Sequence, residues 1–441
     1  MITIPFTIPG ERVRVSVRRV GDGGFVGAVT ELLQRSPHRV DPRCPHFGLR
    51  QGPATAGCGG CTWQHIAYPE QLRLKSALVT RLIGEAVRGS PPAHAAIPGT
   101  PLDAPWGYRQ KAHFVFAATS QRTQANRSRP ALAMGHYVRG TRRIIPVVTC
   151  PVHDERGNAL AFRLRDAVKE SGITAADVPT VKGFAVRVAA GTDEMMATFV
   201  LTANADRRLR AVSRRIIEAP GGPSSFHVNI HPRGDAYIFG RQTRRITGTE
   251  RMREQVGDTA FLVSPTAFFQ TNVRAAEVLG RLVIDAVPHP SRVLDLYAGS
   301  GLFAIPLARA GNRVVAVENN DVAVADGEAS RRLNDVAEEQ CRFIRRRVEE
   351  ALPGLRQRFD VVVLDPPRAG CPAAVIDGVF RRLAPPLAVY ISCNPEALAR
   401  DLRPIVGHGY EIASLQPVDM FPHTAHVETV AILRRRTRTQ E

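Results

Sequence analysis

The chain has 441 residues, 44% of them hydrophobic and 23% charged, which is the composition of a water-soluble globular protein of roughly three domains. No run approaches the ~18 uninterrupted apolar residues that a membrane-spanning helix needs. The N-terminal residues also lack the layout of a signal peptide, so we expect a cytoplasmic protein with no membrane contact. Lysine and arginine number 59 against 41 aspartate and glutamate, a net charge of +18. Such a field attracts polyanions, and nucleic acid is the expected partner.

Residues 1–40 are predicted to form a short, basic β-module. Apolar and charged residues alternate between Arg12 and Arg18, as in a strand with one buried face, and Phe25–Val29 is a second apolar run after a glycine loop. This strand content is too short to close a barrel by itself.

The cysteines point to a metal site. Their number, seven, is odd, and in a cytosolic chain this argues against a disulfide framework. Cys58 and Cys61 form a Cys-x-x-Cys pair, and Cys44 and Cys150 supply two more thiols. Four thiolates suit a tetrahedral zinc ion or a [4Fe–4S] cluster, and the spacing does not decide between these two and four metal-free thiols.

The sequence pattern over residues 41–262 predicts a central mixed α+β domain. A helix is expected over Tyr68–Arg88, followed by a proline-rich connector over Pro91–Pro105. One strand is expected before a polar loop over Thr119–Arg129 and one after it. Further strands and one helix follow, with arginines that we expect to meet phosphate groups: Arg233, Arg241, Arg244 and Arg245.

Residues 263–441 predict an α/β domain with a Rossmann-like, seven-stranded sheet. Ser264-Pro265 is a favourable helix start, and we expect a helix over Thr266–Ala286. Strands then alternate with helices, and the last two strands pair as an antiparallel hairpin. The expected strands are Val293–Leu296, Arg313–Glu318, Cys341–Ile344, Phe359–Asp365, Leu387–Ser392, Glu411–Val418 and Val427–Leu433.

The first of these strands leads into a glycine turn, reading VLDLYAGSG over Val293–Gly301. Glycines at such a turn let the backbone approach a ligand, and Glu318, about 20 residues after the first glycine, suits a carboxylate that holds ribose hydroxyls. Asp365 and Cys393 follow two later strands. Because ligands bind beyond the carboxyl ends of such strands, these residues should line one crevice. We interpret it as a cofactor site beside a cysteine nucleophile; nicotinamide chemistry would use the same turn but gives no reason for the cysteine.

Three blocks resemble the signature motifs of the RNA uracil-5-methyltransferase family: DPPRAG over Asp365–Gly370, ISCNP over Ile391–Pro395 and FPHTAHVE over Phe421–Glu428. FFQTN over Phe268–Asn272 and the Cys58–Cys61 segment match the family too, so the resemblance covers nearly the whole chain. It implies S-adenosylmethionine as the methyl donor and RNA as the substrate, ribosomal RNA before transfer RNA.

The resemblance also implies roles for single residues. Cys393 would add to carbon 6 of the uracil, and Glu428 would remove the proton from carbon 5 after methyl transfer. The implied cofactor-binding residues are Gln270, Tyr297, Gly299, Glu318 and Asp365, with Asp365 also at the uracil edge; Leu302 stands where ribosomal-RNA members often carry a polar residue. For Cys44, Cys58, Cys61 and Cys150 the resemblance implies a [4Fe–4S] cluster, and for residues 1–40 an abbreviated TRAM-like domain.

Two other functions are alternatives to uracil methylation. An iron–sulfur RNA-binding protein with a non-catalytic methyltransferase fold would need neither Cys393 nor Glu428, yet both are present. A cytosine-5 RNA methyltransferase would share the cysteine chemistry but resembles different sequence blocks. We therefore expect a monomeric RNA (uracil-5-)-methyltransferase.

Overall fold

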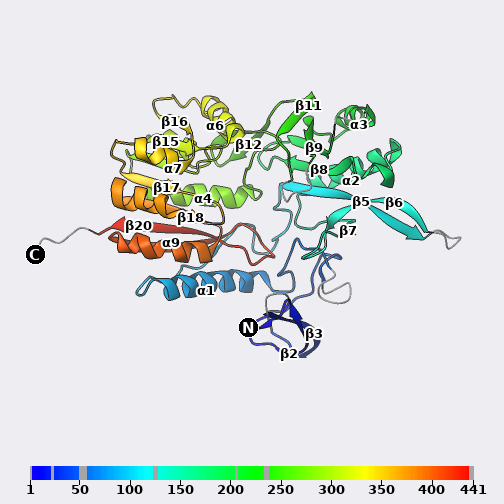
Figure 1. The fold of residues 1–441 in the computed structure, drawn as a ribbon, viewed down its shortest axis with the longest axis horizontal. Helices are drawn as coiled ribbons and strands as arrows, with labels where there is room; N and C mark the ends of the chain where they lie inside the picture. Colours follow the sequence, from blue (N-terminus) through cyan, green and yellow to red (C-terminus); the bar gives the residue numbers. More distant parts are fainter. Residues whose placement is uncertain are drawn as a thin grey trace, which may run out of the picture.

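A computed structural model of the protein describes residues 2–20, 24–48, 57–122, 128–203, 207–232 and 238–436. The C-terminal α/β part and the central β-rich part lie next to each other, with the N-terminal sheet at one end of the molecule (Figure 1). No helix among these residues combines the length and apolar character needed to cross a membrane.

The N-terminal module is a three-stranded open sheet in the order β1-β3-β2, with β1 parallel to β3: β1 (Ile2–Thr3), β2 (Arg12–Val20) and β3 (Gly24–Gln34). Glu11 fixes it to the following segment through Arg39, whose Nε and Nη2 atoms each lie 2.6 Å from a carboxylate oxygen. Arg39 Nη2 also donates to the Phe6 carbonyl at 2.8 Å. Among the described residues these strands do not close a barrel, as expected from their length.

The central part is built on a mixed seven-stranded sheet in the order β11-β10-β9-β8-β5-β6-β7. Its helices α2 (Glu155–Glu170) and α3 (Arg207–Ile217) pack on the apolar cluster around Phe184 and Phe199. A 3₁₀ turn spans Ala175–Asp177. The strands are β5 (Lys111–Arg122), β6 (Ser128–Tyr137), β7 (Ile144–Pro146), β8 (Val181–Val188), β9 (Met195–Leu201), β10 (Ser225–Ile230) and β11 (Gln242–Gly248).

Two local expectations for this part differ from the structure. The described ends of the loop predicted over Thr119–Arg129 are strand, because β5 and β6 continue as an antiparallel pair up to Arg122 and Ser128; residues 123–127 lie outside the described residues. Helix α2 was not predicted; it begins after Asp154, whose side chain accepts a hydrogen bond from the Arg156 amide as an N-cap.

A two-stranded ladder of β12 (Met252–Val256) and β13 (Thr259–Val263) leads into the C-terminal part. The helix predicted from Thr266 begins later, as α4 (Val273–Ala286), so the predicted start at Ser264 is wrong. The Ser264 amide and hydroxyl both bond to Asp326 instead, at 2.7 and 2.6 Å. Asn272 is the true N-cap, accepting a bond from the Ala275 amide.

The C-terminal sheet has the order β16-β15-β14-β17-β18-β20-β19-β4. The first five strands are parallel, and β20 and β19 form the expected antiparallel hairpin. Seven strands match the predicted ones, and the α/β fold class is confirmed. They are β14 (Arg292–Leu296), β15 (Arg313–Glu318), β16 (Cys341–Arg345), β17 (Val361–Leu364), β18 (Leu387–Ser392), β19 (Tyr410–Asp419) and β20 (Glu428–Arg435).

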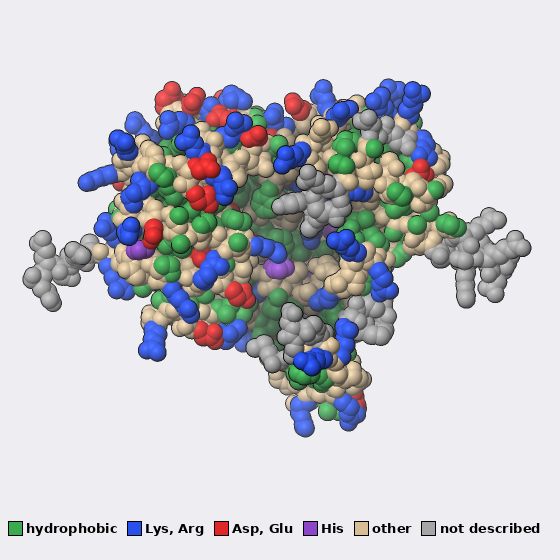
Figure 2. All heavy atoms as spheres, in the orientation of Figure 1, with side chains coloured by type: hydrophobic (Ala, Val, Ile, Leu, Met, Phe, Trp, Pro, Cys, Tyr) green, Lys and Arg blue, Asp and Glu red, His purple; other side chains and the backbone are tan. Residues whose placement is uncertain are grey.

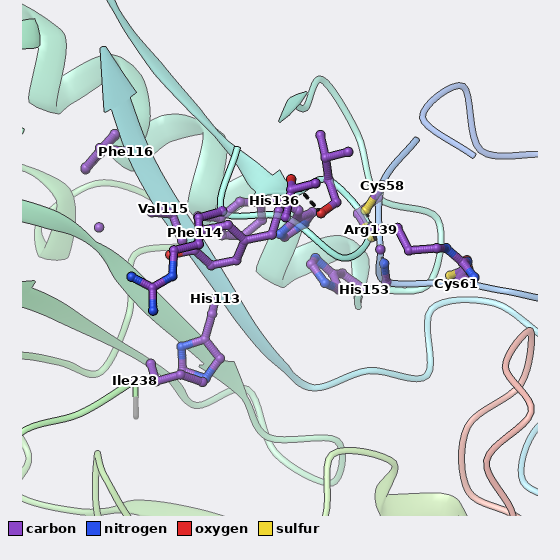
Figure 3. Close-up of a pocket in the computed structure, with 18 of the residues that line it drawn as sticks. Cys58, Cys61, His113, Phe114, Val115, Phe116, His136, Arg139, His153 and Ile238 are labelled. Atoms are coloured by element: carbon purple, nitrogen blue, oxygen red, sulfur yellow. Dashed lines mark hydrogen bonds between the residues drawn. The ribbon is translucent and has the colours of Figure 1, made fainter. Parts of the chain in front are cut away.

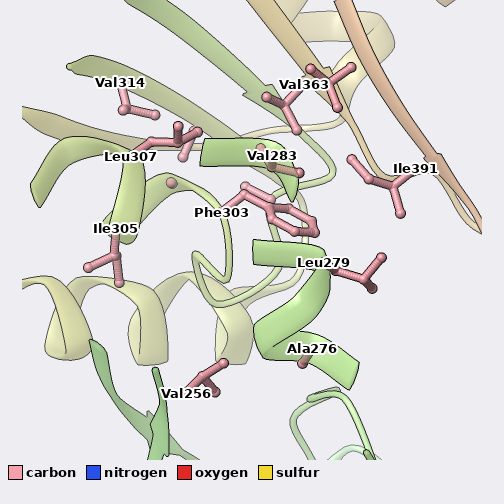
Figure 4. Packing of buried hydrophobic residues seen from close by; sticks show 14 of the residues in the cluster. Val256, Ala276, Leu279, Val283, Phe303, Ile305, Leu307, Val314, Val363 and Ile391 are labelled. Carbon is pink, nitrogen blue, oxygen red and sulfur yellow. The ribbon is translucent and has the colours of Figure 1, made fainter. Parts of the chain in front are cut away.

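An eighth strand, β4 (Ile97–Pro98), comes from the proline-rich connector and pairs parallel with β19. Helices cover the faces of the sheet, and on one face Phe303 packs among Leu279 and Val283 of α4 and Val363 and Ile391 of the sheet (Figure 4). The remaining helical segments are α5 (Ala304–Arg309), α6 (Asp321–Leu333), α7 (Val348–Ala351), a 3₁₀ turn (Leu352–Gly354), α8 (Ala373–Ile376), a π-helical segment (Asp377–Leu383) and α9 (Pro395–Gly407).

Helix α1 (Tyr68–Ala86) belongs to the N-terminal half of the chain but packs on the C-terminal sheet, beside α9 (Figure 1). Its Val79 and Ile83 are fully buried in the same cluster as the residues of the C-terminal strands. Lys75 and Asp419 form an ion pair at 2.5 Å with both side chains fully buried. This contact fixes α1 against the end of β19.

Candidate active site

Four parallel strands, β14, β15, β17 and β18, end at one edge of the C-terminal sheet. Hydrogen-bonded register pairs Leu296 with both Val317 and Leu364, and Leu364 with Tyr390. The residues that follow these positions therefore share that edge. The structure accordingly brings Tyr297, Gly299, Glu318, Asp365 and Cys393 together there.

The glycine turn is held by Glu318. Its Oε2 atom accepts a hydrogen bond from the Gly299 amide at 3.0 Å, and its Oε1 atom accepts two more from the Asn319 and Asn320 amides. Tyr297, Gly299 and Gly301 all have positive φ, and a Cβ at Gly301 would press on Phe343 and Ile305. At Gly299, by contrast, a Cβ would meet nothing within 4 Å, so space for a ligand is open beside this turn.

Asp295 is a site residue that the sequence analysis did not single out. It lies inside β14 with no exposed surface, and neither carboxylate oxygen has a hydrogen bond of normal geometry among the described residues. Burial, followed by the charges of Asp365 and Glu318, holds the pKa of Asp295 well above its usual range. A charged residue inside an otherwise apolar strand was the signal that could have identified it.

Cys393 and Glu428 meet because β18 and β20 are antiparallel, with Ser392 opposite Thr429. Glu428 is 5% exposed, and burial raises its pKa to about 8, with Asp365 adding to the shift and Arg368 opposing it. Burial alone raises the pKa of Asp365 to about 7. Burial also raises the pKa of the Cys393 thiol to about 11, with Glu428 and Asp365 adding and Arg368 opposing. Two carboxyl groups and a thiol therefore lie near one another with little solvent around them.

The loop that follows β17 and the loop that follows β18 are fixed to each other. Asn394 caps α9 and donates from Nδ2 to the Arg368 carbonyl at 3.0 Å. Asp401 of α9 accepts from the Cys371 amide and from the Tyr390 hydroxyl, both at 2.7 Å. Gly370 has φ of +79°, and a Cβ there would lie 2.4 Å from Asp401, so glycine is required.

The Phe268–Asn272 segment lies beside the same strands. Asn272 donates from Nδ2 to the Met420 carbonyl at 3.1 Å, and Phe269 is buried against Phe261. Gln270 is 9% exposed, whereas Phe268 is 73% exposed. An exposed aromatic ring offers a stacking surface for a base.

All four cysteines of the predicted metal site line one cavity of about 1070 Å³, on the face of the central sheet (Figure 3). Cys44 and Cys61 are buried, and Cys58 and Cys150 are half-buried. Burial raises the pKa of Cys61 and of Cys150 to about 12. Arg139 donates to the Cys61 carbonyl at 2.8 Å and lies near the thiols.

This cavity is not lined by Cys393 or Glu428. Cys341 and Cys371 are buried elsewhere, in the apolar clusters of the C-terminal part.

The thiols are not packed as around a single ion. Among the described residues, the group with three ligand atoms within 4.8 Å of one another is His136, Cys150 and His153, and it contains only one of the four thiols. The Nε2 atom of His136 and the Nδ1 atom of His153 are buried without a hydrogen bond. Their rings are edge-to-face with centroids 5.4 Å apart.

Basic side chains occur on the cavity wall and on the edge strand β11. Arg109, Arg139, Arg142 and Lys182 line the cavity. Arg241, Arg244 and Arg245 are exposed, as a phosphate contact requires, while Arg233 lies outside the described residues. On the face shown in Figure 2 the molecule is hollowed near its centre, and Lys and Arg side chains border the hollow.

Known RNA methyltransferases are similar to this chain over most of its length. A family model described as tRNA (Uracil-5-)-methyltransferase matches residues 226–436. The chain is 33% identical to an uncharacterised RNA methyltransferase of Gloeobacter violaceus, over 97% of this chain and 90% of that one. It is also 33% identical to one of Thermosynechococcus vestitus, over 98% and 93%. The crystal structure of Pyrococcus abyssi tRNA (uracil-54, C5)-methyltransferase with S-adenosyl-L-homocysteine matches with a TM-score of 0.76 at 27% identity, over 98% and 94%.

Proposed function

Because the chain belongs to the RNA uracil-5-methyltransferase family, whose enzymes depend on S-adenosylmethionine, we propose that it methylates carbon 5 of a uridine in RNA through a covalent bond from Cys393. The observation that carries this proposal is the proximity of Cys393, Glu428 and Asp365, largely buried at the carboxyl end of the sheet. Cysteine and carboxylate are the two groups that carbon-5 methylation of a pyrimidine needs.

The residues at the glycine turn fit S-adenosylmethionine, a cation. Glu318 already bonds the Gly299 amide, and the open space beside Gly299 leaves room for the adenosine. Asp295 is a buried carboxyl group near Glu318 and Asp365, and three acidic side chains together suit a positively charged ligand. We assign Gln270, Tyr297, Gly299, Glu318 and Asp365 to cofactor binding, and we add Asp295. When bound, S-adenosylmethionine supplies a methyl group on a sulfonium.

The chain's own residues then account for the remaining steps. The Cys393 thiolate, formed by loss of its proton to solvent, adds to carbon 6 and turns the base into an enolate whose carbon 5 takes the methyl group. Glu428 next removes the carbon-5 proton, the carbon–sulfur bond breaks, and the double bond reforms. The raised pKa of Glu428, about 8, makes its carboxylate a stronger base than an exposed one. The target base must leave its stack in the RNA to reach Cys393 and Glu428.

The matching test of the reaction is product analysis. Mass-spectrometric mapping of RNA from cells with and without the gene should find 5-methyluridine at one uridine only when the gene is present. 5-Methylcytidine at that position would instead support a cytosine enzyme. Ribosomal RNA before transfer RNA stays a prediction. Because the family model and the Pyrococcus abyssi enzyme are both named for transfer RNA, transfer RNA belongs in the first measurement.

We propose that residues 1–40 and 41–262 bind the RNA and that residues 263–441 carry out the chemistry, in a monomeric cytoplasmic protein. The exposed arginines of β11 and the basic cavity wall support an RNA-binding role for the central part. The TRAM-like character of residues 1–40 rests on the family resemblance, and their alternating arginines suit phosphate contacts.

We also propose that Cys44, Cys58, Cys61 and Cys150 hold a [4Fe–4S] cluster rather than zinc. Four thiolates around one zinc ion at ~2.3 Å must lie close together, whereas no three of these sulfurs lie within 4.8 Å of one another. The corners of a cluster are farther apart, and Arg109 and Arg139 would offset its negative charge.

Protein purified without oxygen is therefore expected to contain about four iron and four sulfide per chain. Iron and sulfide should be lost in Cys58→Ser and Cys61→Ser, and kept in Cys341→Ser, whose cysteine is buried in the other domain. Metal analysis and visible absorption measure this. Colourless protein with one zinc per chain would contradict the cluster and leave the methylation proposal intact.

A further inference from the structure

The segment between β19 and β20, residues 420–427, leads directly into Glu428, the first residue of β20. His423 stands five residues before Glu428 and has φ of +66°, a left-handed conformation that side chains other than glycine rarely adopt. Such a conformation costs on the order of 1 kcal/mol, so other contacts must hold it. His423 is 3% exposed.

Contacts from the N-terminal half hold both the backbone and the ring of His423. The His423 amide donates to Gln71 Oε1 at 2.8 Å, and its carbonyl accepts from the Thr62 and Trp63 amides, both at 2.9 Å. The Trp106 ring stacks on the imidazole with centroids 3.9 Å apart.

The imidazole is fixed in one protonation state. Gln71 Nε2 lies 3.3 Å from His423 Nδ1, and His423 Nε2 lies 2.8 Å from the Pro105 carbonyl. Both contacts are satisfied when the proton is on Nε2, an assignment made from the partners. Burial lowers the pKa of His423 to about 4. The ring is therefore neutral, and it acts by its shape and hydrogen bonds.

The two residues before His423 are fixed from the same side. Lys75 Nζ donates to the Phe421 carbonyl at 3.1 Å, and the Tyr108 hydroxyl donates to the Pro422 carbonyl at 3.0 Å. Gln71, which is fully buried, has two amide hydrogens for three acceptors, which are His423 Nδ1 and the Trp63 and Ile66 carbonyls, so one hydrogen is shared between two of them. These contacts join the segment to residues 62–66. We call Gln71, Trp106 and His423 the His423 clamp.

We propose that the His423 clamp positions Glu428 for removal of the carbon-5 proton. This inference rests on the proposed function. Cys393 depends on other contacts, namely Asn394 with Arg368 and Asp401 with the Cys371 amide. Glu428 opens β20, where it pairs with Val418, and the clamp holds the chain that enters this position. A loosened clamp is therefore expected to shift the base, while the contacts around the nucleophile are unchanged. Misplacement of a reacting group by about 1 Å can cost about 10²-fold in rate.

The test compares Gln71→Met, which keeps the volume of the side chain and removes its amide, with Gln416→Met. Gln416 is a matched control, because its amide also donates to two carbonyl groups, those of Ala95 and Pro417, and neither belongs to residues 420–427. Rapid-quench reactions use S-adenosylmethionine with a labelled methyl group and the RNA identified by mapping. Denaturing gels then give separate rates for formation and decay of the methylated protein–RNA adduct.

Gln71→Met is expected to form the methylated adduct within about twofold of the wild-type rate and to release product about 10–10²-fold more slowly, so the adduct accumulates. His423→Asn, which tolerates a left-handed backbone but lacks the ring, should behave alike. Gln416→Met should match wild type. A merely structural role would slow formation and decay together, or lower the amount of folded enzyme without changing either rate.

Two results separate the failures. If Glu428→Gln accumulates the methylated adduct but Gln71→Met and His423→Asn both decay at the wild-type rate, the clamp does not position the base. His423→Asn gives a second test if Gln71→Met fails to fold. If circular dichroism shows that His423→Asn is folded, and adduct formation and decay are slowed equally in it, the proposal that the clamp positions Glu428 is overturned. If Glu428→Gln itself accumulates no adduct, it is the proposed role of Glu428 that fails.

Discussion

Cys393→Ala is expected to lose methylation by about 10⁴-fold or more, because no other described side chain at the sheet edge can add to carbon 6 of the uracil. Without that bond carbon 5 is too weak a nucleophile to take a methyl group from a sulfonium. No covalent protein–RNA species should form, with or without S-adenosylmethionine. Denaturing gels with labelled RNA and methyl-transfer assays measure the two losses separately.

Binding provides the control for this result. Cys393 is half-buried just after β18, and the hydrogen bonds described above that fix the loops are made by other residues, so Cys393→Ala should still bind S-adenosylmethionine with wild-type affinity. Cys341→Ala, which removes a buried thiol from β16, should retain both methylation and adduct formation. Methylation by Cys393→Ala at one-tenth of the wild-type rate would show that another group is the nucleophile.

Glu428→Gln is expected to stop the reaction after methyl transfer. The nucleophile remains, but the amide cannot take the carbon-5 proton, so a covalent enzyme–RNA species with the new methyl group should accumulate and survive a denaturing gel. Product release should fall by about 10²–10⁴-fold. The adduct should require S-adenosylmethionine for its label and be absent from the Cys393→Ala/Glu428→Gln double variant. Turnover at the wild-type rate would exclude Glu428 as the base and leave Asp365 as the next candidate.

The same variant should change the pH dependence of stability. The pKa of Glu428 is raised to about 8 in the folded protein, above its usual value of 4.5, so folding favours the protonated form. That contribution is fully present below pH 4.5 and is lost as the pH rises through about 8. In denaturant unfolding, the free energy of unfolding of Glu428→Gln relative to wild type should therefore be higher at pH 9 than at pH 5, by on the order of a few kcal/mol. A pH-independent difference would contradict the raised pKa.

The parts of the site that the sequence predicted are those set by local pattern and topology. Glu318, Asp365 and Cys393 each stand at the end of an apolar run, and parallel strands bring such ends together, so their common edge could be inferred without coordinates. The family resemblance drawn from the motifs is confirmed by the comparisons. The roles of the single residues stay predictions until the variants are measured.

What could not be predicted depends on contacts between distant residues. Ser264 is a favourable helix cap by its type, but Asp326 occupies its hydroxyl and amide. Strand β4 has only two residues and exists because β19 offers it a partner. The clamp on His423 joins residues more than 300 positions apart. Neither periodicity nor capping preference contains such information, because each describes only neighbours along the chain.

The docking of α1 on the C-terminal sheet has a consequence for how the protein is made. Lys75 and its partner Asp419 are 344 positions apart. At a synthesis rate of about 5–20 residues per second, α1 leaves the ribosome roughly 20–70 s before Asp419 does. During this interval Lys75 has no counter-ion, and Val79 and Ile83 have no strands to cover them. The first long helix of the nascent chain is thus among the last to reach its final place, and in that window it is a natural substrate for chaperones.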